Sequence, residues 1–61
     1  MDFGEFLKEQ RQAKNISIYR LAKLTNIAWS QLDGYEKGRN SPTIKNAEKI
    51  CKALQTIFVI R

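Results

Sequence analysis

The chain contains no histidine and only one cysteine, Cys51. A disulfide framework needs pairs of cysteines, and ordinary zinc sites need several cysteine or histidine ligands. The composition therefore excludes both, and we expect neither a metal nor a cofactor. Cys51 stands at a helical core spacing, where a lone cysteine is more often a small buried hydrophobic residue than a nucleophile.

Further absences narrow the possible functions. The sequence has no glycine-rich phosphate loop and no nucleophile with a base at hand, and 61 residues are too few for a closed catalytic pocket. We therefore predict that the protein is not an enzyme. No segment approaches the ~20 apolar residues of a membrane span, and no signal peptide is visible. These features predict a cytoplasmic protein with no membrane association.

Acidic residues are scarce relative to basic ones. Six aspartates and glutamates accompany eleven lysines and arginines, so the formal net charge is +5. A small basic domain suits a polyanionic partner, nucleic acid first, although a merely soluble surface is the alternative. Residues 1–61 make one domain. A chain of this length buries only roughly 60% of its unfolded surface, so we expect a partner to add stability.

Apolar residues recur at helical spacing and predict an all-α fold of four to five short helices. The first helix is expected over residues 2–14, with Asp2 as its N-cap and Glu5 three residues later. Ser17 is the expected N-cap of the second helix. A fourth helix is expected from its cap, Thr43, to about Leu54, with an inward stripe of Ile44, Ala47, Ile50, Cys51 and Leu54.

The stretch 21–38 predicts two short helices joined by a tight turn. Asn26 tolerates the left-handed conformation that such a turn requires. The second of these helices is expected over residues 29–37, after Ala28, whose side chain cannot cap it. Gly38 stands where the end of a helix favours a left-handed glycine. Helices this short are not stable alone and must pack on flanking segments.

The spacing of these residues resembles the phage repressor and Cro-type (XRE-like) helix-turn-helix family of DNA-binding domains. The matching positions run from about residue 3 to residue 54, with the helix-turn-helix at about 17–38. They are Leu7, Arg11, Leu21, Ala22, Ile27, Leu32, Glu36, Gly38, Pro42, Ile44, Ala47, Ile50 and Leu54. The resemblance implies a lambda-repressor-like bundle and sequence-specific binding of double-stranded DNA. It also implies a small transcriptional regulator, with repression the expected role, associated with the nucleoid when bound.

The resemblance also assigns roles to individual residues. Helix 29–37 would lie in the major groove, with its first residues at the base edges. The base-reading positions would be Trp29, Ser30, Gln31, Asp33 and Gly34, where glycine reads no base and permits close backbone approach. Contacts to phosphates would come from Ser17, Arg20, Lys37, Arg39, Asn40 and Ser41. Arg11 lies on the apolar stripe of Leu7, and the family pairs the matching position with that of Glu36, so we expect a largely buried ion pair.

A second interpretation is a helix-turn-helix module that binds a protein, for example a toxin or another repressor. Ile18, Leu24 and Trp29 would form an exposed apolar patch, which is typical of protein interfaces. DNA contact, protein contact and partial burial all remain open for Trp29.

The C-terminal tail, residues 56–61, is rich in β-branched and aromatic side chains and suits a short extended segment. The family normally has a fifth helix here, and the sequence stops too soon for one. Either the tail covers its own helices, or it pairs with its two-fold mate as an antiparallel strand and makes a homodimer. The residues of this dimer contact would be Ile57, Phe58, Val59 and Ile60.

Overall fold

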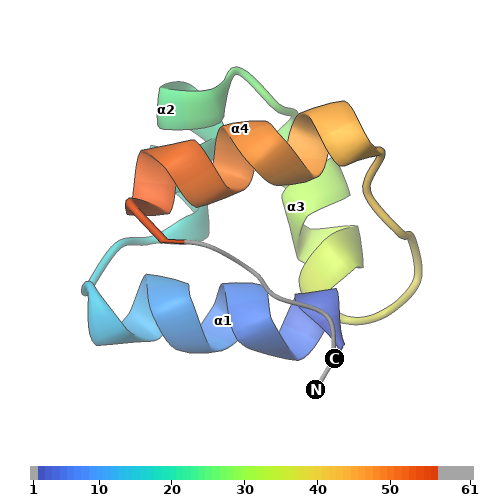
Figure 1. Ribbon diagram of the computed structural model, residues 1–61, viewed down its shortest axis with the longest axis horizontal. Coiled ribbons are helices and arrows are strands. Elements are labelled where there is room, and N and C mark those ends of the chain that lie inside the picture. The colour runs from blue at the N-terminus through green and yellow to red at the C-terminus, as the bar shows by residue number, and fades with distance from the viewer. Residues whose placement is uncertain (1, 57–61) are drawn as a thin grey trace.

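A computed structural model describes residues 2–56, which form four α-helices and no strand (Figure 1). The helices are α1 (Phe3–Ala13), α2 (Ile18–Thr25), α3 (Trp29–Glu36) and α4 (Ile44–Leu54). The all-α fold predicted from the sequence is therefore confirmed. The expectations for the tail after Thr56 lie outside the described residues.

Side chains from the preceding loops define the starts of three helices. The carboxylate of Asp2 accepts from the Glu5 amide at 2.9 Å, and the hydroxyl of Ser17 accepts from the Arg20 amide at 3.0 Å. Thr43 caps α4 in the same way. Each cap supplies an acceptor to an amide that has no partner within its helix, which is why these short-range features were predictable. Ala28 before α3 provides no such bond.

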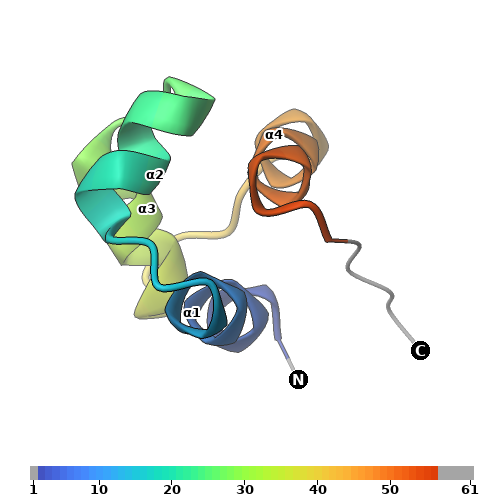
Figure 2. The ribbon, with the colours of Figure 1, turned by 90° about the vertical axis from the view of Figure 1, so that its left-hand side faces the viewer.

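The core lies where the four helices meet. Its buried members are Leu7, Leu21, Ile27, Leu32, Tyr35, Ile50 and Leu54. Figure 2 shows α2 and α3 together on one side of the molecule and α4 on the other, with α1 beneath them. The core therefore holds the helix-turn-helix against a platform made by α1 and α4. None of the helices in the described part is long and apolar enough to cross a bilayer.

The turn between α2 and α3 is held from both sides. Asn26 ends α2 in the left-handed conformation with φ of 59°, as expected. The hydroxyl of Thr25 donates to the Leu21 carbonyl at 2.8 Å and accepts from the Ile27 amide at 3.3 Å. Ile27 is buried in the core. These contacts fix the angle between the two helices of the motif.

Two expectations about apolar residues were wrong. Ile44 was placed on the inward stripe of α4, but it is 83% exposed, because α4 is rotated so that Ile50 and Leu54 enter the core. Ile18 was placed on an exposed patch, but it is partly buried and packs against the core. Ile18 precedes Leu21 by three residues, and that spacing puts both side chains on the same face of α2.

Candidate nucleic-acid interface

The first turn of α3 presents its side chains to solvent. Ser30 and Gln31 are exposed, and Trp29 is 51% exposed. No side chain caps this end of the helix, and its first turn contains no acidic residue. The partial positive charge of a helix N-terminus is therefore not neutralised locally, a condition that suits the approach of an anion.

Asp33 does not share this exposure, which corrects its expected role as a base-reading residue. Its carboxylate is nearly buried and accepts from Arg39 Nη2 at 3.0 Å and from Lys37 Nζ at 3.2 Å, both through Oδ2. Both cations are therefore bound to the same oxygen of this carboxylate, within the same domain. The carboxylate is thus not presented to a base in this conformation.

The charge state of Asp33 follows from the same contacts. Burial alone would raise the pKa of Asp33, but hydrogen bonds and charge from Lys37 and Arg39 together lower it below its ordinary value. A lowered pKa means that the ion pairs stabilise the fold at neutral pH. That contribution is lost as the pH falls from the ordinary aspartate pKa through the lowered one. Lys37 and Arg39 are held close together, and both remain largely exposed.

Gly34 is buried too, and its expected role in close approach to DNA needs the same correction. A Cβ at Gly34 would meet the side-chain amide of Asn40. The Gly34 carbonyl accepts from the amides of Arg39 at 2.9 Å and of Asn40 at 3.3 Å. Gly34 therefore anchors the loop after α3. Gly38 turns that loop with φ of +76°, the left-handed conformation expected for it.

The remaining phosphate candidates are exposed. They lie in the loop after α3, where Asn40 and Ser41 follow Arg39, and at the start of α2, where Arg20 and Ser17 are found. The Ser17 oxygen already accepts the cap bond from Arg20, but its hydroxyl hydrogen is still a donor. Because α2 has no acidic residue in its first turn, Arg20 is not opposed by a carboxylate there.

An ion pair between Arg11 and Glu36 ties the end of α3 to α1. Arg11 Nε and Nη2 donate to the two Glu36 oxygens at 2.7 and 3.1 Å, and Nη1 donates to the Ile16 carbonyl at 2.9 Å. The two side chains are only 15% and 6% exposed. The hydrogen bond and charge of Glu36 raise the pKa of Arg11, against the opposing effect of burial. The pair expected from the sequence is thus present, and the guanidinium stays charged at any ordinary pH.

Three structural contacts near the interface were not found from the sequence. Asn46 donates to the Tyr35 hydroxyl at 3.1 Å and joins α4 to α3. The hydroxyl of Thr25 fixes the turn of the motif. A Cβ at Gly4 would meet the carbonyl oxygens of Tyr35 and Glu36, so α1 approaches the end of α3 backbone to backbone. A threonine at the end of a helix is a visible signal, whereas the other two depend on long-range packing.

Comparison with known protein families identifies the class. The helix-turn-helix family of the XRE/Cro/C1 type matches residues 7–57, which is most of the chain. The protein therefore belongs to this family of DNA-binding domains. Comparisons with curated proteins and with solved structures returned no significant match.

Proposed function

We propose that the protein is a transcriptional regulator, and specifically a repressor, that binds double-stranded DNA sequence-specifically with α3 in the major groove. The observation that carries this proposal is the exposed first turn of α3, in which Trp29, Ser30 and Gln31 face solvent at the uncapped end of the helix. In helix-turn-helix domains the N-terminal residues of the second helix meet the base edges. Such a protein has no catalytic role and acts in the cytoplasm, where the DNA is.

Base recognition falls to the exposed side chains only. Gln31 has an amide that can donate to and accept from an adenine edge, and Ser30 can serve as donor or acceptor. Trp29 can pack against a thymine methyl group. Asp33 and Gly34 are no longer proposed as readers, because both are buried beneath the loop after α3.

Phosphate binding falls to the exposed cations and to the polar residues of the loop. Lys37 and Arg39 share the carboxylate of Asp33, so the three side chains together carry one net positive charge. Asp33 costs some attraction for a phosphate but holds both cations in place, which reduces the conformational entropy lost on binding. Arg20 and Ser17 at the start of α2, and Asn40 and Ser41, complete the proposed set.

Single substitutions should separate the two kinds of contact. Arg20→Ala and Arg39→Ala should weaken binding to all sequences alike and reduce the salt dependence, because phosphates carry no sequence information. Gln31→Ala and Ser30→Ala should relax the preference at particular base pairs, by roughly 1–3 kcal/mol for a good contact. Binding to a panel of duplexes that differ by one base pair, repeated over a range of salt, measures both effects.

Asp33→Asn is the matched control, since it removes charge from α3 without removing a proposed base contact. It should leave the base preferences unchanged. If Asp33→Asn alters the preferred base pairs while Gln31→Ala and Ser30→Ala do not, the assignment of readers is wrong.

We also propose that two copies bind together as a homodimer. A single small domain offers one short recognition helix, and a dimer would read two half-sites roughly 34 Å apart. The apolar run Ile57, Phe58, Val59 and Ile60 is the proposed contact between the copies. A dimer predicts that the bound sequence contains two inverted half-sites, whereas a single half-site would indicate that one copy binds alone.

The second candidate, a protein partner, has narrower support. Leu24 and Trp29 are 53% and 51% exposed, and these two apolar side chains could contact another protein. Ile18 contributes little to such a patch, because it packs against the core. An apolar contact of this kind would respond weakly to salt, in contrast to binding through phosphates.

A further inference from the structure

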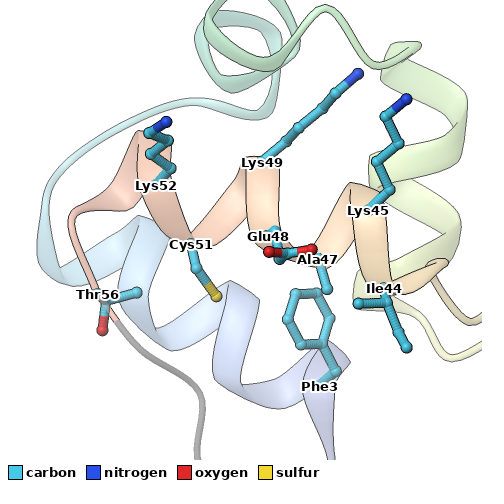
Figure 3. A pocket seen from close by; sticks show the side chains of 9 residues that line it. All are labelled: Phe3, Ile44, Lys45, Ala47, Glu48, Lys49, Cys51, Lys52 and Thr56. Atoms are coloured by element: carbon cyan, nitrogen blue, oxygen red, sulfur yellow. The ribbon is translucent and has the colours of Figure 1, made fainter.

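A groove runs between α4 and the start of α1, and it was not anticipated from the sequence. Figure 3 shows the side chains that line it, with Cys51, Ala47 and Phe3 pointing toward one another. Its lining consists of Phe3, Ile44, Lys45, Ala47, Glu48, Lys49, Cys51, Lys52 and Thr56. The apolar members form the floor, and the charged members come from α4.

Within residues 2–56 this floor is only partly covered. Ile44 at one end is 83% exposed, and Ala47 and Cys51 are partly buried. The other two large aliphatic side chains of α4, Ile50 and Leu54, are fully buried, so Ile44 is the one that this helix leaves exposed. An additional apolar segment on the groove would remove this exposed surface from water.

The chain enters the groove at its other end. Gln55 ends α4 in the left-handed conformation with φ of 54°, and the Thr56 amide donates to the Cys51 carbonyl at 2.9 Å. Thr56 itself lines the groove. The next four residues of the sequence are Ile57, Phe58, Val59 and Ile60, all of them apolar. An apolar segment therefore begins directly after Thr56, which already lines the groove.

The length of residues 57–60 matches the length of the groove. The segment starts after Thr56, whose amide is bonded to the Cys51 carbonyl, and Cys51 lies seven residues, about 10 Å along the helix axis, from Ile44. Four residues in extended conformation span about 13 Å. The run is therefore long enough to pass along the floor from Thr56 toward Ile44. In an extended segment alternate side chains face opposite ways, so one pair would enter the groove and the other pair would stay available for a second copy.

We propose that the groove between α1 and α4 is the docking site of residues 57–60 of the same chain. A segment joined to the groove without a linker has a high effective concentration there, which favours this occupant over a separate molecule. Figure 2 places α4 across the molecule from α2 and α3, so docking does not involve the DNA-binding side. The inference is therefore independent of the proposed DNA contacts, although it uses the same residues 57–60 as the proposed contact between two copies.

Ile44→Ala tests the proposal directly, in the full chain. Alanine is the better helix former, so on an uncovered surface the substitution should leave Tm unchanged or raise it. If residues 57–60 cover Ile44, the lost contact should instead lower Tm by about 4–8 °C. The matched control is the same substitution in a chain whose residues 57–60 are all serine, where it should no longer lower Tm. An unchanged or higher Tm for Ile44→Ala in the natural sequence overturns the proposal.

Cys51 provides a second, independent measurement, because it is the only thiol of the chain. Its rate of reaction with a disulfide reagent should rise about tenfold when residues 57–60 are replaced by serine, under conditions where circular dichroism shows the helices intact. The protection should persist in the natural chain at concentrations where sedimentation finds a monomer. Protection that disappears on dilution to the monomer would assign the groove to a second copy and overturn docking within one chain.

Discussion

Arg11→Ala is expected to remove most or all of the stability of this domain. The substitution leaves the Glu36 carboxylate buried without its partner, and breaking a buried pair from one side typically costs about 3–5 kcal/mol. At about 0.05–0.15 kcal/mol per residue, a chain of this length has a total stability of only roughly 3–9 kcal/mol. Arg11 also holds the Ile16 carbonyl, so the connection between α1 and α2 would lose a hydrogen bond as well.

Thermal or urea unfolding followed by circular dichroism measures this effect. Lys8→Ala is the matched control, because Lys8 is an exposed cation on the same helix and should change stability little. Arg11→Met combined with Glu36→Leu should recover much of the loss, since no buried charge then remains unpaired. Arg11→Ala melting within a degree or two of the natural protein would show that the pair does not hold α1 to α3.

Gly4→Ala is expected to destabilise the fold, although alanine is normally the better residue in a helix. Replacing a helical glycine usually contributes about 1 kcal/mol of stability. Here the new Cβ would meet the backbone carbonyls of Tyr35 and Glu36, which cannot rotate away as a side chain can. Overpacking of this kind costs about 1–3 kcal/mol, so the net effect should be a lower Tm and a lower urea midpoint.

Gly34→Ala provides the comparison for Gly4→Ala. Its Cβ would meet the flexible end of the Asn40 side chain, which can move, so helix propensity should offset most of the cost. We therefore expect Gly34→Ala to be much the milder of the two. A Gly4→Ala protein more stable than the natural one would mean that α1 and the end of α3 can separate without cost.

Features that depend on neighbouring residues could be predicted from the sequence. The caps at Asp2, Ser17 and Thr43 and the left-handed Asn26 and Gly38 all follow from local hydrogen bonding and backbone sterics. The Arg11–Glu36 pair was predictable in a different way. A cation on an apolar stripe needs a partner, and the family resemblance supplied it.

Features that depend on how the helices are rotated against one another could not be predicted from the sequence. Helical spacing puts Ile44 on the same inward stripe as Ile50 and Leu54, and the burial of those two was predicted correctly, but only packing decides that Ile44 stays in solvent. The ion pair of Asp33 with Lys37 follows from their spacing of four residues. The second ion pair, with Arg39, forms only because the turn at Gly38 brings Arg39 back toward Asp33. The close approach at Gly4 has no local signal at all.

Selection of bound sites from random duplexes, repeated at about 50 and 200 mM salt, tests sequence-specific DNA binding most directly. We predict a two-fold symmetric motif at the lower salt and a loss of affinity on the order of 10³-fold at the higher, as expected for contacts to several phosphates. Recovery of no motif, or binding that does not respond to salt, would contradict a role in sequence-specific recognition of DNA.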